Sequence, residues 1–224
     1  MNTLLESHAR LMLSLQARMN SKVDPLWVAK RFPYLRAVVI EAAEAIEHHG
    51  WKWWKKQACD MPQLQMEIID IWHFLLSEIL LEHEDEHLKA TGWLLEAAAE
   101  QRPGNAVEFD GKSYGLDSMS LVSKLELLIG LSVTRRIDIV LFRSLLSDCG
   151  LSWDELFRQY VSKNVLNFFR QDNGYKEGSY QKMWHGREDN EHLVELMRQL
   201  DANSANYPEQ LYQELASRYP GAAL

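Results

Sequence analysis

Apolar residues recur at spacings of three and four along most of this chain, and this pattern constrains the fold more than any other feature of the sequence. Such spacing is typical of amphipathic helices, and no segment shows the convincing alternation expected of a half-buried strand. We therefore predict an all-α protein, built as a helical bundle core with additional helices. Helices are expected at residues 4–20, briefly after Asp24-Pro25, at 33–50, 60–84, 86–101, 117–131, 134–147 and 152–170, and as two short ones at the end of the chain.

The length of 224 residues allows one large domain, and we predict a single domain over residues 1–224. If the domain includes a smaller helical lobe, we expect it within residues 86–150. Residues 106–116 form the least regular segment, directly after the break at Pro103-Gly104-Asn105. The polar and aromatic stretch 171–186 is interpreted as a loop with a function or as a disordered link.

The net charge of −8 disfavours binding to nucleic acid polymers, because an acidic surface repels their phosphate backbone. It still allows a small triphosphate, provided that a metal ion supplies local positive charge. The two cysteines, Cys59 and Cys149, form neither a metal-ligand pattern nor a disulfide framework, which fits a reducing compartment. Neither a membrane span nor a signal peptide is apparent, so we expect a cytoplasmic protein with no membrane partner.

Two pairs of carboxylates lie on neighbouring predicted helices: Glu41 with Glu44, and Glu67 with Asp70. Residues three apart project from one side of a helix, and the second pair lies in a strongly apolar helix where unpaired charge is unfavourable. Oxygen ligands of this kind suit Mg²⁺, so we predict a metal site between the two helices. The alternative is two solvated helix faces. The nearby histidines are weaker candidates, because imidazole is not a preferred ligand of Mg²⁺.

Basic and aromatic residues follow the acidic helices in two places. The stretch Trp51–Lys56 (WKWWKK) is predicted to be a loop whose lysines reach phosphates, or else a hydrophobic plug with solvated lysines. In the helix expected at 152–170, Lys163, Asn167 and Arg170 share one face. Asn167 carries the donor and acceptor needed for the O4/N3–H edge of uracil, and Arg170 can bind phosphate bidentately. The alternative is an amphipathic helix with a polar face.

Three blocks of the sequence resemble the dimeric, all-α dUTPases, which belong to the wider superfamily of MazG-like nucleotide pyrophosphatases. The blocks are EAAEAIEHHGWKWWKK, QMEIIDIWHFLLS and KNVLNFFRQDNGYKEGSYQKMW, and the N-terminal LMLSLQARMN resembles a fourth. The paired acidic motifs specify only the superfamily, whereas the third block points to the dUTPase branch. The resemblance spans about residues 11–184, although residues 85–150 match no known block.

The resemblance implies a homodimer that binds dUTP and more than one Mg²⁺ ion. It implies that Glu41, Glu44, Glu67 and Asp70 hold the metal. Gln16 and Asn167 would bind uracil, Phe74 would lie against its ring, and a loop tryptophan would close the pocket. We favour Trp54 for that role, with Trp51 and Trp53 as alternatives. Phosphate binding or loop ordering would fall to Lys55, Lys163, Arg170, Tyr175, Lys176 and also Lys182.

The hypothesis for the reaction is hydrolysis of dUTP, with dUDP as a further substrate. Water activated by bound Mg²⁺ would attack the α-phosphorus and release pyrophosphate. Glu44 is our choice to orient or deprotonate this water, and Arg170 would stabilise the charge on the leaving group. A related pyrophosphatase for dCTP or another nucleotide is one alternative, since a freely rotating amide accepts either pyrimidine. A catalytically idle nucleotide- or protein-binding helical protein is the other.

Overall fold

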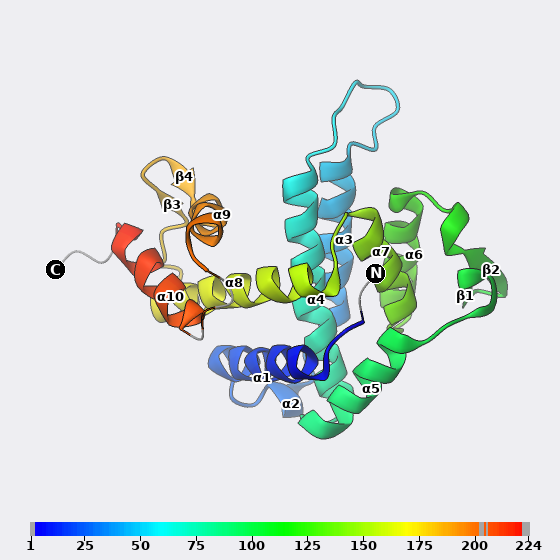
Figure 1. Cartoon of the computed structure of the whole chain (residues 1–224), viewed down its shortest axis with the longest axis horizontal. Helices are drawn as coiled ribbons and strands as arrows, with labels where there is room; N and C mark the ends of the chain where they lie inside the picture. The colour runs from blue at the N-terminus through cyan, green and yellow to red at the C-terminus, as the bar shows by residue number, and fades with distance from the viewer. Residues whose placement is uncertain (1–2, 202–203, 205, 221–224) are drawn as a thin grey trace.

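The computed structural model describes residues 3–201, 204 and 206–220, so the two ends of the predicted domain 1–224 lie outside the described residues. The described residues form ten α-helices, which confirms the all-α prediction (Figure 1). The helices are α1 (Glu6–Val23), α2 (Trp27–Lys30), α3 (Tyr34–His49), α4 (Met61–Glu82), α5 (His87–Ala99), α6 (Leu121–Val133), α7 (Ile139–Asp148), α8 (Trp153–Asp172), α9 (Asp189–Gln199) and α10 (Tyr207–Arg218).

Several helix ends follow from the local sequence. Gly50 ends α3 in the left-handed region, with φ of 82°, where a residue without a Cβ is favoured. The Asp60 side chain accepts a hydrogen bond from the Gln63 backbone at the start of α4, and Ser152 and Glu155 form the expected capping box of α8. These caps fix where the helices of the candidate site begin and end.

Two predicted helix starts were wrong. The helix expected from residue 117 begins at Leu121, because Ser120 accepts a hydrogen bond from the Ser123 backbone N–H and caps α6 there. The helix expected from residue 134 begins at Ile139, where Asp138 caps α7 in the same way through Leu141. In both cases a capping side chain inside the predicted range determines the true start.

Residues 106–115 form a β-hairpin, which corrects the prediction that the chain lacks strands. Strand β1 (Ala106–Phe109) pairs antiparallel with β2 (Lys112–Gly115). The turn residues Asp110 and Gly111 both have positive φ, the conformation that suits a two-residue hairpin loop. A second, very short hairpin, β3 (Met183–Trp184) with β4 (Arg187–Glu188), lies within the stretch predicted as a loop.

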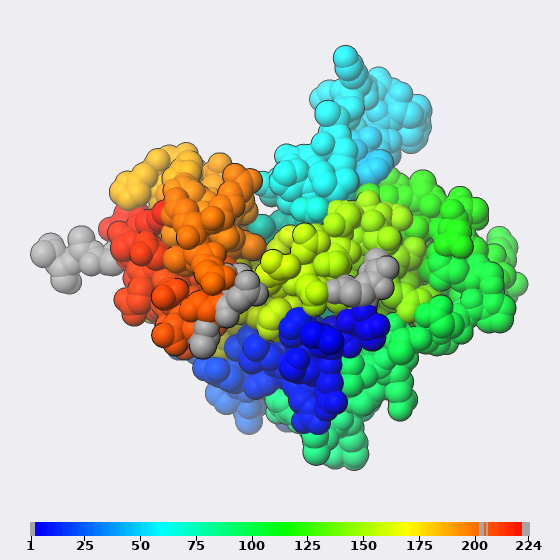
Figure 2. All heavy atoms as spheres, in the orientation of Figure 1, coloured from blue at the N-terminus to red at the C-terminus, as the bar shows by residue number. Residues whose placement is uncertain are grey.

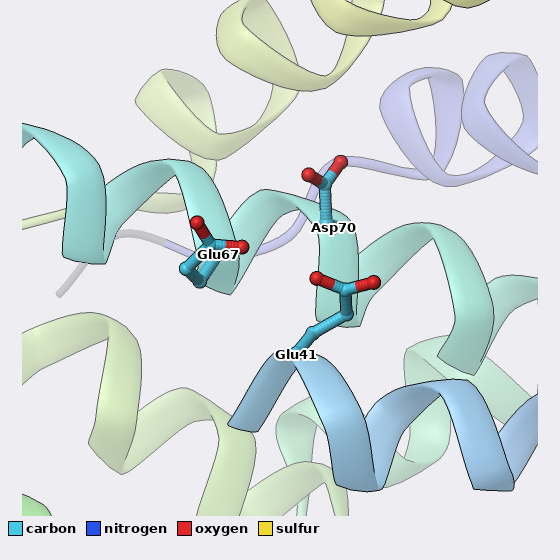
Figure 3. Close-up of side chains that lie close together, drawn as sticks. All are labelled: Glu41, Glu67 and Asp70. Carbon is cyan, nitrogen blue, oxygen red and sulfur yellow. The ribbon is translucent and has the colours of Figure 1, made fainter. Parts of the chain in front are cut away.

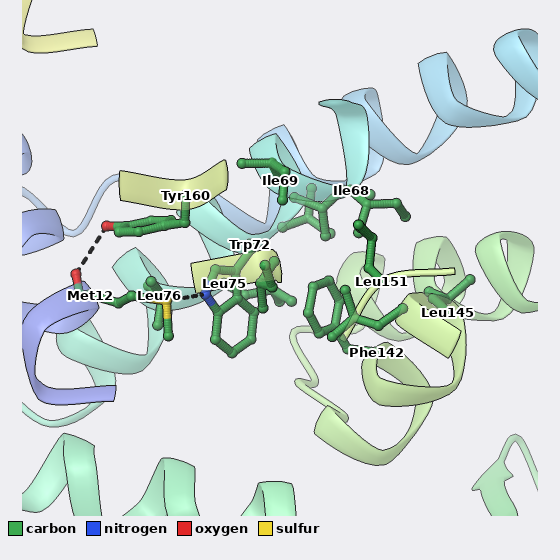
Figure 4. Packing of buried hydrophobic residues seen from close by; sticks show 14 of the residues in the cluster. Met12, Ile68, Ile69, Trp72, Leu75, Leu76, Phe142, Leu145, Leu151 and Tyr160 are labelled. Atoms are coloured by element: carbon green, nitrogen blue, oxygen red, sulfur yellow. Dashed lines mark hydrogen bonds between the residues drawn. The ribbon is translucent and has the colours of Figure 1, made fainter. Parts of the chain in front are cut away.

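Helix α4 is the centre of the fold, with α1, α3, α5 and α8 packed around it (Figure 1). Trp72 lies at the middle of this core, stacked on Phe142 with ring centroids 4.7 Å apart, and its indole nitrogen lies 3.3 Å from the Met12 sulfur (Figure 4). One cluster of buried residues extends from Leu4 to Tyr219. Because residues 86–150 contribute to that same cluster, we propose that the chain forms a single domain without a separate lobe. None of the described helices combines the length and apolarity needed to span a bilayer.

Candidate active site

Three of the four predicted metal ligands converge between α3 and α4. Glu41 projects from α3, and Glu67 and Asp70 project from α4 into the same space (Figure 3). One carboxylate oxygen from each lies within 4.8 Å of the others. Ala42 and Ala45 are small buried residues of α3, and α3 packs against α4 more extensively than against any other helix. The apolar stripe of α3 therefore brings its bordering Glu41 against the acidic strip of α4.

Two carboxylates of this group, Glu41 and Glu67, have raised pKa values. Burial, together with the charges of Asp70 and Glu67, raises the pKa of Glu41 to about 8. Burial and the charge of Asp70 raise the pKa of Glu67 to about 7, although a hydrogen bond from Glu41 opposes this. Both groups therefore hold protons well above the normal carboxylate range. A divalent cation would remove this repulsion and take the place of the protons.

Lys163 is the cation closest to the acidic group. Its Nζ lies 2.9 Å from Asp70 Oδ2 and also donates to Asn190 Oδ1 at 3.2 Å. The residue is 3% exposed, so this ammonium neutralises Asp70 from the protein side. His48 approaches Glu67 with a distance of 3.5 Å between Nε2 and Oε1. One lysine does not offset three carboxylates once all of them are ionised, so the ionised group would have negative charge available for a cation.

Glu44 lies outside the three-residue group. It is one turn beyond Glu41 on α3, and its side chain is exposed. Its charge still contributes to raising the pKa of both Glu41 and Glu67, which places it near them. The predicted set of four thus divides into three converging carboxylates and one solvent-facing neighbour.

A cleft of about 450 Å³ opens beside the acidic group, between α1, α3, α4 and α8. It brings together seven of the residues predicted for metal or substrate: Gln16, Glu41, Asp70, Phe74, Asn167, Arg170 and Tyr175. The other lining residues are Met19, Asn20, Val23, Phe32, Tyr34, His73 and Gln171. The cleft therefore joins a carboxylate group to an aromatic and amide-lined space, the combination that a nucleotide with its phosphates requires.

Arg170 reaches the cleft, but most of its guanidinium is already engaged. Nε and Nη2 both donate to the Asp189 carboxylate at 2.8 Å, and Nη1 donates to Asn167 Oδ1 at 3.2 Å. The bidentate face that we expected to bind phosphate is therefore bound to Asp189. That carboxylate is fully buried and also accepts from the Tyr180 hydroxyl at 2.8 Å. Burial alone would raise the pKa of Asp189, but Arg170 holds it below its usual range.

The remaining predicted substrate residues lie outside the cleft. Trp54 and Lys55 are exposed in the loop between α3 and α4, which projects away from the rest of the molecule (Figures 1 and 2). Lys163 lies behind Asp70, as described above. Lys176 follows Tyr175, and its Nζ donates to the Val23 carbonyl at 2.7 Å, which ties the segment after α8 to the end of α1.

The sequence prediction gave no substrate-binding role to four residues of the site. His73 and Asn20 line the cleft and are almost fully buried, and Tyr34 lines it with its pKa raised by burial to about 12. The spacing gave a usable signal for the first two, since His73 is three residues after Asp70 and Asn20 is four after Gln16. Asp189 gave no signal, because nothing in its local sequence distinguishes it from a solvated residue in the first turn of a helix.

A larger cavity of about 630 Å³ lies elsewhere, against α5, α6 and α7. Its cations already have partners: Lys124 Nζ lies 2.6 Å from Asp148 Oδ2, and Arg143 donates to the carbonyls of Ala98 and Glu100. The converging carboxylates are at the smaller cleft, so we identify that cleft as the candidate active site.

The acidic group fits Mg²⁺ on its donor chemistry. All three side chains offer oxygen, and one ligand atom from each lies within 4.8 Å of the others. Burial and neighbouring negative charge raise the pKa of Glu41 and Glu67, and a divalent cation would offset both effects. The open cleft beside them would give phosphate oxygens and water access to an ion held there.

A comparison with family models finds a match to the family described as dUTPase, over residues 8–175. A comparison with curated proteins finds no match. The matched stretch contains the three converging carboxylates, the cleft and α8, and it covers most of the chain. The fold, the cleft and this match together establish that the chain belongs to the all-α dUTPase family of enzymes, which hydrolyse dUTP.

Proposed function

We propose that this dUTPase converts dUTP to dUMP and pyrophosphate with Mg²⁺ held by Glu41, Glu67 and Asp70, and that dUDP is a further substrate. The observation that carries the proposal is the convergence of these carboxylates at the edge of a cleft lined by amides and aromatic rings. When bound, Mg²⁺ supplies positive charge to the phosphates and lowers the pKa of water in its coordination shell.

The chain's own residues then orient the reaction. Lys163 holds the Asp70 carboxylate in place through its 2.9 Å contact. Glu44, the solvent-facing neighbour of the group, would orient the attacking water and accept its proton. Arg170 keeps one Nη1 N–H that does not serve Asp189 or Asn167, and this N–H would bind the departing phosphates.

In this proposal the base occupies the amide-lined part of the cleft. Gln16 and Asn167 would hydrogen-bond uracil, and Phe74 would lie against the ring. Tyr175, over which the Arg170 guanidinium lies at 5.9 Å, would close the phosphate end together with Lys176. Trp54 and Lys55 would complete the site from the projecting loop. We further propose a cytoplasmic homodimer, as the resemblance to the dimeric dUTPases implies.

Pyrophosphate release from a panel of nucleotides tests the proposal. The panel consists of dUTP, dCTP, dTTP and UTP, with phosphate release from dUDP measured separately, each in Mg²⁺ and in EDTA. We expect release from dUTP in Mg²⁺ and none in EDTA. Activity on dUTP that survives EDTA would contradict the metal role, and activity on dCTP without dUTP would contradict the substrate.

The raised carboxyl pKa values predict an unusual pH dependence of stability. Because the folded protein binds protons at Glu41 and Glu67 that the unfolded chain has lost above pH 4.5, the free energy of unfolding should fall as pH rises from about 5 to 8. In EDTA we expect the free energy of unfolding to decrease by about 1–3 kcal/mol over this range. This is less than the two pKa shifts alone would give, because water in the cleft screens both carboxylates. Thermal denaturation across this range measures it.

Magnesium provides the control for this pH experiment. Saturating Mg²⁺ binds the ionised carboxylates of the folded protein, so the decline should disappear or reverse. Asp189 affects the pH dependence of the free energy of unfolding with the opposite sign, because its pKa is lowered. Its stabilising contribution is lost only below about pH 4. A metal-free protein whose stability is flat between pH 5 and 8 would contradict the mutual repulsion of the acidic group.

A further inference from the structure

His48 lies at the edge of the acidic group and has no part in the proposed reaction. Its Nε2 is 3.5 Å from Glu67 Oε1, and its side chain is 34% exposed. It reaches the group only through Glu67, because the three converging ligand atoms belong to Glu41, Glu67 and Asp70 (Figure 3). The 3.5 Å separation is longer than a normal N–H···O hydrogen bond, so the His48 nitrogen faces the carboxylate without being tied to it.

This separation matches that of two ligands of one zinc ion. Zn²⁺ binds histidine nitrogen and carboxylate oxygen at about 2.0–2.2 Å, usually in a tetrahedral shell. Two atoms that each lie about 2.1 Å from a common ion, at the tetrahedral angle, are about 3.4 Å apart. One Zn²⁺ ion could therefore bridge the His48 nitrogen and the Glu67 oxygen with little movement of either side chain.

Glu44 offers a third ligand from the same face of α3. Glu44 and His48 are four residues apart on this helix, so both side chains project from one side of it. Two ligands at this spacing on one helix face are a known way to hold zinc. Glu44 is exposed and makes no hydrogen bond or ion pair within the described part of the chain. Its charge acts on Glu67, which shows that the two carboxylates are neighbours.

Magnesium binding leaves the imidazole of His48 without a use. Mg²⁺ prefers oxygen ligands and keeps several waters, whereas imidazole favours ions such as Zn²⁺. Zn²⁺ also binds mixed nitrogen and oxygen sites more tightly than Mn²⁺ or Fe²⁺ does. His48 thus adds a kind of ligand that changes which ions the acidic group accepts.

We propose that Glu44, His48 and Glu67 bind Zn²⁺, and that zinc bound there inhibits the enzyme. The inference rests on the proposed Mg²⁺-dependent reaction, in which Glu67 holds Mg²⁺ and Glu44 orients the attacking water. Zinc held by these two carboxylates withdraws both from the reaction. The acidic group therefore takes two classes of ion: Mg²⁺ through oxygen alone, and Zn²⁺ through oxygen and the nitrogen of His48.

Isothermal titration calorimetry of the metal-free protein with Zn²⁺ and, separately, with Mg²⁺ tests this site. The unmodified protein should bind Zn²⁺ more tightly than Mg²⁺. Loss of a group that only orients a metal ligand costs about 10- to 100-fold in affinity, so His48→Gln, which removes a ligand itself, should raise the Kd for Zn²⁺ by at least about that factor. The Kd for Mg²⁺ should change less than about threefold, because every carboxylate is retained.

His87→Gln is the matched control for the titrations. His87 makes a histidine–carboxylate contact of 3.2 Å with Asp85 in another part of the fold, at the start of α5. Its replacement should leave the Kd for both ions unchanged. Zinc held by the exposed Cys59 thiol would persist in both variants, so the difference between the unmodified protein and His48→Gln isolates the proposed site.

Cobalt gives a readout that does not depend on activity. Co²⁺ substitutes for Zn²⁺ and shifts the proton resonances of an imidazole bound to it. If Nε2 of His48 binds the ion, its Nδ1 keeps an exchangeable proton. The Co²⁺-loaded protein should therefore show a strongly shifted, exchangeable imidazole N–H signal that is absent from His48→Gln and present in His87→Gln.

Equal Zn²⁺ affinity in the unmodified protein and His48→Gln would overturn the proposal, and so would the absence of that shifted signal. Added Zn²⁺ should inhibit dUTP hydrolysis in Mg²⁺, and the zinc concentration for half-inhibition should rise in His48→Gln together with the Kd. Hydrolysis that zinc does not affect would overturn the inhibitory role. Failure of the proposed function gives a different result, namely no hydrolysis of dUTP in Mg²⁺ alone, whereas the titrations and the cobalt spectrum are measured without turnover.

Discussion

Glu41→Gln is expected to lower kcat for dUTP by roughly 10²–10³-fold while making the metal-free protein more stable. The amide keeps the shape of the side chain but removes one of three converging carboxylates, so the metal loses an anionic ligand. The same change removes the charge that burial, Asp70 and Glu67 oppose. At pH 8 in EDTA we expect a gain of about 1–2 kcal/mol, discounted for screening in the cleft, and a rise in Tm of roughly 2–8 °C.

Glu47→Gln is the matched control for this experiment. Glu47 lies on the same helix but is exposed, and it bonds to Trp51 and Lys52 rather than to the acidic group. Its replacement should change neither kcat nor the pH dependence of stability appreciably. Activity kept in Glu41→Gln, or a metal-free protein that becomes less stable, would show that Glu41 does not belong to a repulsive metal site.

The second large effect is expected from Arg170→Ala, which should destabilise the fold by about 3–5 kcal/mol. The substitution leaves the fully buried Asp189 carboxylate with the Tyr180 hydroxyl but without its cation. For a chain of this size the expected fall in Tm is roughly 6–20 °C. Activity should fall as well, measured at a temperature where the variant is folded, because the remaining N–H at the cleft is lost.

A double variant separates the two roles of Arg170. Arg170→Ala with Asp189→Asn removes the unpaired charge and keeps an acceptor for Tyr180, so most of the stability should return. Activity should stay low, since no guanidinium reaches the cleft. If the stability of the double variant does not return, the Arg170–Asp189 pair does not stabilise the contact between α8 and α9. If activity returns together with stability, Arg170 supports activity only by stabilising the fold.

The sequence was sufficient for the parts of this site that depend on helical periodicity and capping. The stripe of Val38, Ala42 and Ala45 predicted which face of α3 is buried, and therefore that Glu41 borders a helix contact. The spacing of Glu67 and Asp70 in a strongly apolar helix predicted that both carboxylates project from one side of α4. Local rules fix these features, because residues three and four apart share a face wherever the helix packs.

Features set by contacts between distant segments were not predictable in this way. The partner of Arg170, Asp189, is 19 residues away along the chain. The packing of Trp184 and Tyr180 against Phe169 helps to bring it back to α8. The hairpin at 106–115 did carry a signal, since Asp110-Gly111 favours a two-residue turn, but its strands are too short for alternation to show. The position of the Trp51–Lys56 loop depends on tertiary contacts, which cannot be predicted from the composition of the loop.

The salt bridge between Arg170 and Asp189 also bears on how much of the chain makes up the functional unit. The family match ends at residue 175, yet Asp189 and Asn190, which orient Arg170 and Lys163, lie beyond that boundary. A fragment trimmed to the matched stretch would retain the carboxylates and the cleft but would lose the contacts from the start of α9 to two cations, Arg170 and Lys163. Helix α9 thus stabilises the positions of two basic side chains at the active site. A design that recombines this enzyme with its relatives should therefore exchange α8 and α9 together.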